Sequence, residues 1–386
     1  MIPISDEVPD CPLCGASRDG IVVGSHGRFG MQVRNIACEV CGLVYVTPRP
    51  SHAAMMDYYR GTYREHYGEV RYPMPSGGSA GPGDPEYQAA LDVWHENQAA
   101  NALALSRPQP GARVLEIGCR HARTLQLMRE RADIRPFGIE PGPAEAQAAE
   151  QAGVPCFQGT LEEYPEAEPF DQIQLFHVLE HFHDPLSQLV RLRGLLAPEG
   201  KLLIEVPNVV QPYGLLEENF FQNVHLVSFS PNTLAAMCQR AGLAPLRVIS
   251  REALFLVATP DPDAPAELPL PFDRSTLPDP TEDAAWVAER LWAYAELEKA
   301  RVAIHAFGPT MEALESVVSR VARPAFPDHV GKTVADLAEF FMTHGSARAA
   351  CVIATAAAAG PHPPDMRAAF QRLAQATAQN LAPAAQ

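Results

Sequence analysis

Apolar runs and amphipathic stretches alternate along the middle of the chain, between residues 112 and 259. The apolar runs are rich in Val, Ile, Leu and Phe and predict strands, whereas the stretches between them carry apolar residues at helical spacing. Strands that alternate with helices in this way predict a mostly parallel sheet with helices on both faces. Only a few residues separate the last two strands, so we expect a hairpin and an antiparallel final edge. The predicted strands are 112–118, 135–140, 154–159, 171–177, 201–206, 245–250 and 253–259, and the predicted helices between them are 123–132, 142–153, 185–197 and 230–242.

Less regular segments divide the rest of the chain. Residues 51–85 begin with a tyrosine-rich stretch that we expect to be partly helical, and they end in a run of Pro, Gly and Ser. That run predicts a flexible linker, with a mobile lid as the alternative. A helix is predicted at 86–106, and the proline-rich residues 261–282 predict a second linker. The pattern of residues 283–386 predicts a small α/β domain, which begins with a helix and has strands at 301–307 and 349–356.

Two Cys-x-x-Cys pairs lie near the N-terminus. Cys11 and Cys14 form the first pair, Cys38 and Cys41 form the second, and a glycine follows each pair. This spacing lets two sulfurs bind one ion from a tight turn, for which glycine supplies the backbone freedom. Four thiolates fill the tetrahedral shell of Zn²⁺ and leave no position for water, so residues 1–50 are predicted to be a structural zinc ribbon. Two coincidental pairs are the alternative, and a redox role is disfavoured because neither pair opens a helix after a strand.

The overall charge and the N-terminal sequence narrow the class of protein. The 386 residues carry 46 acidic against 30 basic side chains, a net charge of −16. An acidic surface repels phosphate, so a nucleic-acid partner is not expected. The N-terminus lacks the basic start and apolar core of a signal peptide, and no apolar run is long enough to cross a membrane. We therefore expect a cytoplasmic protein with reduced cysteines and no membrane partner.

Acidic residues end the first two strands of the predicted sheet. Glu116 ends the first strand, and Gly118 and Cys119 form a tight turn before the next helix. A ligand at this turn would meet backbone N–H groups and a helix N-terminus. Glu140 ends the second strand, where a carboxylate can accept hydrogen bonds from both hydroxyls of a ribose. This combination indicates a nucleotide-like site.

Several motifs in combination carry a family resemblance. VLEIGC, FGIEP, FDQIQLFHVLEHFHDP, LLAPEGKLLIEVPN and HLVSFSPNTLAAMCQRAGL together resemble the class I S-adenosylmethionine-dependent methyltransferases. With CxxCGLVYVTPRP added, the chain resembles a bacterial subgroup with an N-terminal zinc ribbon, which includes deoxysugar C-methyltransferases, over roughly residues 8–260. The resemblance implies a Rossmann-like domain over residues 86–260 with S-adenosylmethionine as cofactor. It also implies a C-terminal half-Rossmann appendage, for which we favour packing or homodimer contacts over a sugar-nucleotide site at Gly308.

The resemblance further implies a role for single residues around the cofactor. The family turn usually reads Glu/Asp-x-Gly-x-Gly-x-Gly, whereas Arg120 and Ala122 stand at its second and third glycines here. Glycine permits close backbone approach and positive φ, so a weakened or lost cofactor site is the alternative. The implied contacts are Glu116, Gly118 and Cys119 for the methionine part, Glu140 for the ribose, Thr160 and Leu161 for the adenine, and Phe176 and His177 for the sulfonium region.

Histidines near this site are the candidate catalytic residues. Transfer to carbon or oxygen needs a base for the acceptor proton, and histidine titrates near neutrality. His181, in the motif HVLEHFH, is one candidate, with a structural role as the alternative and a metal cluster of this motif disfavoured. His225 is the other, because the C-methyltransferases that this chain resembles place a histidine over the substrate; a hydrogen-bonded loop hinge is its alternative. Tyr58, Tyr59 and Tyr63 are candidates for facing the acceptor, although packing is the favoured role.

The favoured function is methyl transfer from S-adenosylmethionine to carbon or oxygen of a small-molecule acceptor, such as a sugar nucleotide or a natural-product intermediate. Two alternatives stay open. Arg120 and Ala122 motivate a non-catalytic scaffold or binding protein that has kept the fold. A zinc-ribbon enzyme that modifies a macromolecule, such as tRNA or a protein, is the other, and the acidic balance speaks against its tRNA form.

Overall fold

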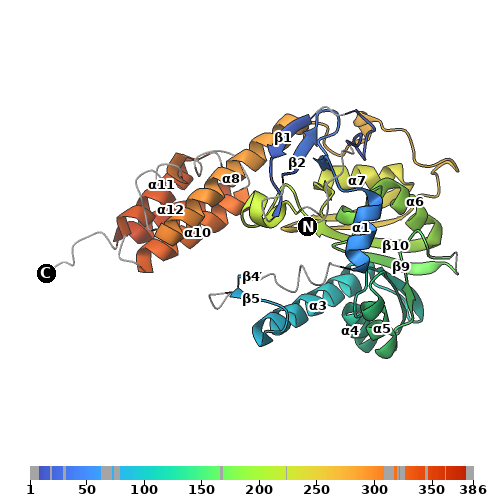
Figure 1. Ribbon diagram of the computed structural model, residues 1–386. Coiled ribbons are helices and arrows are strands. Elements are labelled where there is room, and N and C mark those ends of the chain that lie inside the picture. The colour runs from blue at the N-terminus through green and yellow to red at the C-terminus, as the bar shows by residue number, and fades with distance from the viewer. Residues whose placement is uncertain are drawn as a thin grey trace.

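The computed structural model describes residues 8–17, 20–28, 32–61, 72–73, 79–165, 168–222, 224–307, 317–319, 321, 327–343, 347–360 and 362–379. Within them the central element is a seven-stranded sheet in the order β12-β13-β10-β9-β6-β7-β8 (Figure 1). Neighbouring strands from β8 to β10 run parallel, and β13 runs antiparallel to both β10 and β12. This arrangement confirms the predicted parallel sheet and its antiparallel final hairpin. The strands are β6 (Ala112–Ile117), β7 (Ile134–Glu140), β8 (Cys156–Gln158), β9 (Phe170–Phe176), β10 (Leu196–Pro207), β12 (Leu243–Ser250) and β13 (Ala253–Pro260).

Helices cover both faces of this sheet, because its strands are apolar on both sides. Val114 and Leu115, which are successive residues of β6, are both fully buried but belong to different apolar clusters. Successive strand side chains point to opposite faces, so each face needs its own cover. Figure 1 shows α3, α4 and α5 on one face and α6 and α7 on the other. These helices are α3 (Pro85–Ser106), α4 (Arg123–Arg131), α5 (Pro143–Gln151), α6 (Pro185–Leu195) and α7 (Pro231–Arg240).

A second, four-stranded sheet lies in the N-terminal part, and Cys38 of the cysteine motifs ends one of its strands. Its order is β1 (Gly20–Gly24), β2 (Arg34–Cys38), β3 (Val44–Thr47) and β11 (Val227–Ser228), and all its pairs are antiparallel. β11 comes from the loop that follows β10, so this sheet is hydrogen-bonded directly to the central unit. α1 (His52–Arg60) follows it and buries Met55 and Tyr58, whereas Tyr63 lies outside the described residues. In the predicted linker, β4 (Tyr72–Pro73) and β5 (Ser79–Ala80) form a short ladder.

The C-terminal elements that the structure describes are helices, which corrects the prediction of a small α/β domain. Both predicted strands, 301–307 and 349–356, lie inside helices, and Gly308 lies outside the described residues. Short apolar runs cannot be told from one side of a buried helix, and these runs are rich in alanine, the best helix former. The helices are α8 (Ala284–Phe307), α10 (Pro327–Thr343), α11 (Ala347–Ala359) and α12 (Pro364–Gln379). None of the helices in the described ranges combines the length and apolar character required to cross a membrane.

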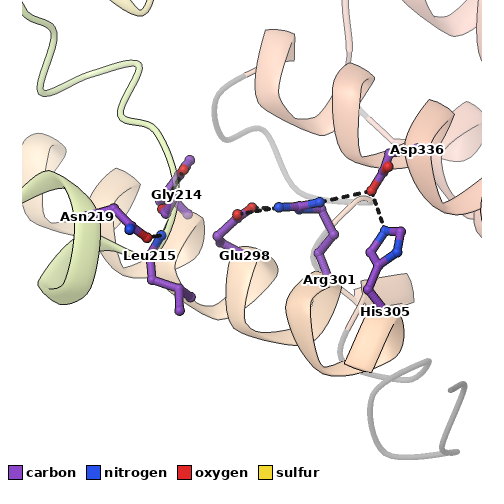
Figure 2. Close-up of polar contacts among 8 residues, drawn as sticks. Gly214, Leu215, Asn219, Glu298, Arg301, His305 and Asp336 are labelled. Carbon is purple, nitrogen blue, oxygen red and sulfur yellow. Dashed lines mark hydrogen bonds and ion pairs between the residues drawn. The ribbon is translucent and has the colours of Figure 1, made fainter. Parts of the chain in front are cut away.

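α8 joins the N-terminal sheet to the C-terminal helices (Figure 1). Leu291, in its first half, packs in one cluster with residues of β1 to β3, and Ile304, near its end, packs with α10 and α11. An ion-pair network strengthens the second contact: Arg301 lies 2.7 Å from Glu298 and 3.0 Å from Asp336 (Figure 2). α8 therefore packs against both the N-terminal sheet and the C-terminal helices.

Candidate functional site

A cavity of about 630 Å³ lies at the carboxyl edge of the parallel strands. The strand order reverses between β6 and β9, and open α/β sheets bind ligands at such a switch point. Loops after the five strands β6 to β10, together with α1 and α3, supply its walls. Glu116 and Cys119 are buried next to the lining residues Ile117 and Gly118. The other residues predicted to bind the cofactor or to act in catalysis all line the cavity: Gly118, Glu140, Thr160, Leu161, Phe176, His177, His181 and His225.

The turn after β6 keeps a glycine-like backbone although two expected glycines are absent. Gly118 has a φ of +68°, and a Cβ there would meet Val178 Cγ2 at 2.9 Å. Arg120 and Ala122 have φ values of 51° and 53°, also in the left-handed region. That conformation costs a non-glycine residue about 1–2 kcal/mol, which the surrounding structure must offset. The substitutions at Arg120 and Ala122 therefore do not force the turn out of the left-handed conformation.

Glu140 connects this turn to the start of α5. The N–H of Arg120 donates to its Oε2 at 3.0 Å, and the N–H of Gly142 donates to its Oε1 at 2.8 Å. Burial raises the pKa of this carboxyl above its ordinary value, while the two backbone donors oppose that rise. Each carboxylate oxygen keeps a further lone pair for a ligand in the cavity.

The side chains of Glu116 and Cys119 contact the protein interior on the side of the turn away from the cavity. Gln174 Nε2 donates to Glu116 Oε2 at 2.7 Å, and burial raises the pKa of Glu116 to about 8 despite this bond. Cys119 Sγ lies 3.7 Å from Cys156 Sγ on β8. Both side chains are therefore buried in the protein interior. The residues between them, Ile117 and Gly118, line the cavity instead.

His177 follows β9 and lies between two buried carboxylates. Its Nδ1 is 3.5 Å from Glu180 Oε1 and its Nε2 is 3.4 Å from Glu205 Oε1. Burial alone would lower its pKa, but the two carboxylates raise the pKa of His177 to about 10. It is thus a cation at neutral pH. Neither acid is among the residues predicted from the sequence, although Glu205 stands out there as an acid inside the apolar strand KLLIEV.

The two predicted catalytic histidines lie next to each other. The ring centroids of His181, in the 3₁₀ turn Leu179–His181, and His225 are 4.8 Å apart. His181 Nδ1 lies 3.0 Å from the Val224 carbonyl oxygen and 2.9 Å from the Tyr59 hydroxyl. Burial lowers the pKa of His181, and it lowers the pKa of His225 to about 3. Both rings are therefore neutral at neutral pH.

The four N-terminal cysteines form a separate cluster. Cys11 Sγ is 3.5 Å from Cys41 Sγ, and Cys14 Sγ is 3.5 Å from Cys38 Sγ. A tetrahedron with Zn–S bonds of about 2.3 Å has S···S edges of roughly 3.8 Å, close to these distances. The two turns share one shape, since the glycine after each pair has positive φ and donates its N–H to the first cysteine, at 2.9 Å for Gly15 and 2.8 Å for Gly42.

Comparison with known proteins matches the central unit to a family. Residues 92–248 match the family described as "Methyltransferase domain". Two curated relatives are tRNA U34 carboxymethyltransferases, each 29% identical: one from Methylococcus capsulatus over 43% of this chain and 53% of its own length, and one from Marinobacter nauticus over 40% and 50%. The chain thus spans about half the length of these relatives. A similar solved structure is that of the S-adenosylmethionine-bound amino pentose methyltransferase CalS10 from Micromonospora echinaspora, with 20% identity, a TM-score of 0.35, and coverage of 45% of this chain and 96% of that one.

These matches correct two predictions. Both curated relatives are named for an activity on tRNA, which contradicts the predicted small-molecule acceptor and the predicted absence of a nucleic-acid partner. The net charge misled because it is summed over the whole chain, whereas an acceptor site is local. The family match tests neither the alternative of a non-catalytic scaffold that has kept the fold nor the deoxysugar C-methyltransferase subgroup. Residues 92–248 thus match a methyltransferase domain, and their sheet has the strand order expected of the class I fold.

Proposed function

We propose that this protein is an S-adenosylmethionine-dependent enzyme that methylates a base of RNA, with tRNA as the acceptor class. The aromatic cavity at the switch point of a methyltransferase domain is the observation that carries this proposal. The names of the two curated relatives support the acceptor class.

The cavity edge suits an adenosyl cofactor. Glu140 offers a buried carboxylate in the cavity for the ribose hydroxyls, and Gly118 lines the cavity beside it. Glu116 and Cys119 would support the methionine end, Thr160 and Leu161 would flank the adenine, and Phe176 and His177 would lie near the sulfonium. When bound, the cofactor supplies an electrophilic methyl group. The chain's own residues hold donor and acceptor in line and exclude water, which is the main catalytic effect available in such a displacement.

The acceptor part of the cavity suits a planar base. Aromatic rings from several elements face it, and bases of single-stranded RNA are commonly bound by stacking on such rings. An enzyme that modifies a base takes it out of its stack into a fitted pocket. The aromatic lining residues are Tyr59, Tyr87, Trp94, Phe182 and Tyr213.

Transfer of a labelled methyl group tests this function. The purified chain is incubated with S-adenosylmethionine labelled at the methyl group and with unmodified tRNA, and the RNA is then digested to nucleosides for mass spectrometry. We expect label in one modified nucleoside and formation of S-adenosylhomocysteine in equal amount. Cofactor binding without label in any nucleoside would overturn the proposed acceptor, and absence of cofactor binding would overturn the proposal entirely.

Replacing Trp94 with alanine should weaken binding of the acceptor more than binding of the cofactor. Stacking of a base on an aromatic ring contributes about 1–3 kcal/mol, so we expect KM for tRNA to rise by roughly five- to a hundredfold. The affinity for S-adenosylhomocysteine, measured by calorimetry, should change far less. Trp292→Ala is the matched control because Trp292 is 49% exposed on α8. Equal KM values for the two variants would contradict base stacking on Trp94.

We also infer that the four-cysteine cluster binds one structural Zn²⁺. Three observations support this: all four sulfurs lie within 4.8 Å of one another, their spacing is near that of a zinc tetrahedron, and both turns have the same glycine-dependent shape. Since the four thiolates complete the coordination shell, the ion would stabilise the N-terminal sheet without taking part in methyl transfer.

A further inference from the structure

Glu180, His181 and His225 converge beside the cavity from two separate segments. One possible ligand atom from each lies within 4.8 Å of the other two. Glu180 and His181 belong to the 3₁₀ turn after β9, whereas His225 lies just before β11. His181 and His225 line the cavity, and Glu180 lies behind them at 1% exposure.

The donor atoms of this group are arranged as they would be around a metal ion. A carbonyl oxygen only accepts hydrogen bonds, so the contact of His181 Nδ1 with Val224 O, at 3.0 Å, places the ring hydrogen on Nδ1. The lone pair of Nε2 then faces Glu180 Oε1 across 3.8 Å. Glu180 already forms an ion pair with His177, whose Nδ1 lies 3.5 Å from Oε1, but among the described residues neither carboxylate oxygen of Glu180 has a hydrogen-bond partner. A lone pair and a buried carboxylate that face each other are stabilised by a cation between them.

The surroundings of His181 are those of a metal ligand. Histidines that bind a metal through one ring nitrogen commonly donate the other N–H to a backbone carbonyl, which fixes the tautomer and the ring orientation. The bond to Val224 O provides this support. Two imidazoles and one carboxylate are a donor set that suits Zn²⁺, and three protein ligands leave one position open.

We propose that Glu180, His181 and His225 bind a second Zn²⁺ ion at the wall of the cavity, with its open position toward the acceptor. Its role rests on the proposed function: the open position would bind an oxygen or nitrogen of the RNA base and hold that base in line with the methyl donor. His181 and His225 would then act as metal ligands, and not as the proton acceptors that the sequence suggested.

Counting zinc tests this site without any assay of activity. The full chain is loaded with Zn²⁺, freed of loosely bound metal by gel filtration, and analysed by elemental mass spectrometry. We expect two zinc ions per chain in the unaltered protein and one in His181→Ala, in His225→Gln and in Glu180→Gln. His183→Ala, from the same loop but outside the group, should keep two ions.

Cobalt substitution shows whether a variant that has lost a zinc ion is still folded. Co²⁺ bound to the four cysteines gives an intense thiolate charge-transfer band, and this band and the affinity for S-adenosylhomocysteine should both persist in a folded variant. Equal metal content in the unaltered protein and in folded His181→Ala would overturn the second site. Two ions without RNA methylation would refute the proposed function alone, whereas RNA methylation with one ion would refute the second site alone.

Discussion

Replacing Glu140 with glutamine is expected to lower the affinity for S-adenosylhomocysteine by roughly ten- to a hundredfold. Each carboxylate oxygen accepts a backbone N–H, from Arg120 and from Gly142, so one of these donors would face the new NH₂ group. A hydrogen bond to a charged group contributes about 1.5–3 kcal/mol, and each 1.4 kcal/mol is a factor of about ten in affinity. The substitution also removes an acceptor for the ribose. Calorimetric titration with S-adenosylhomocysteine measures the loss.

The matched control for this prediction is Glu130→Gln on α4. Glu130 has a 61% exposed side chain and only a 3.8 Å ion pair with Arg123, so its charge should not affect the cavity. Equal dissociation constants for the two variants would show that Glu140 does not bind the cofactor. Circular dichroism of both variants separates a lost contact from a lost fold.

The central sheet was predictable because its strands are apolar on both faces and its turns are short. Runs such as KLLIEV cannot be exposed, and their alternation with helices leaves few other folds. The C-terminal residues carry no such constraint. Residues 301–307 and 349–356 are apolar over lengths that suit a strand or two turns of helix equally, and only the packing of α8, α10 and α11 around a common core decides for the helix.

The site, like the fold, was predictable only where local sequence order decides the structure. Glu140 could be found because its place at a strand end depends on local order. The meeting of His181 with His225 depends on the path of the loop between β10 and β11, which no local pattern records. Glu180 stood in the motif HVLEH but gave no signal of its own, since an acid in a turn is ordinarily exposed. Its burial is a tertiary effect.

Replacing Cys38 with serine is expected to remove the structural zinc and to lower the melting temperature by on the order of 10 °C, because binding free energy at such a site is folding free energy. The effect should extend to the cavity. Cys38 ends β2, β2 pairs with β3, and the N–H of Val46 on β3 donates to Leu226 O at 3.0 Å, one residue after His225. We therefore expect faster amide hydrogen exchange in β2, β3 and the loop with His225, and unchanged exchange in β6 and β9.

Cys351→Ser separates loss of the zinc site from loss of any thiol. Cys351 lies on α11, far along the chain from the four-cysteine cluster, and is only partly buried. This control should keep its zinc content, its melting temperature and the exchange protection of β3. If Cys38→Ser loses one zinc ion but keeps the melting temperature and the protection of the control, the ion does not stabilise the N-terminal sheet. If both properties fall together with the zinc, the cysteine cluster holds in place the loop that carries His225, because β3 pairs with Val227 and Ser228, shortly after that residue.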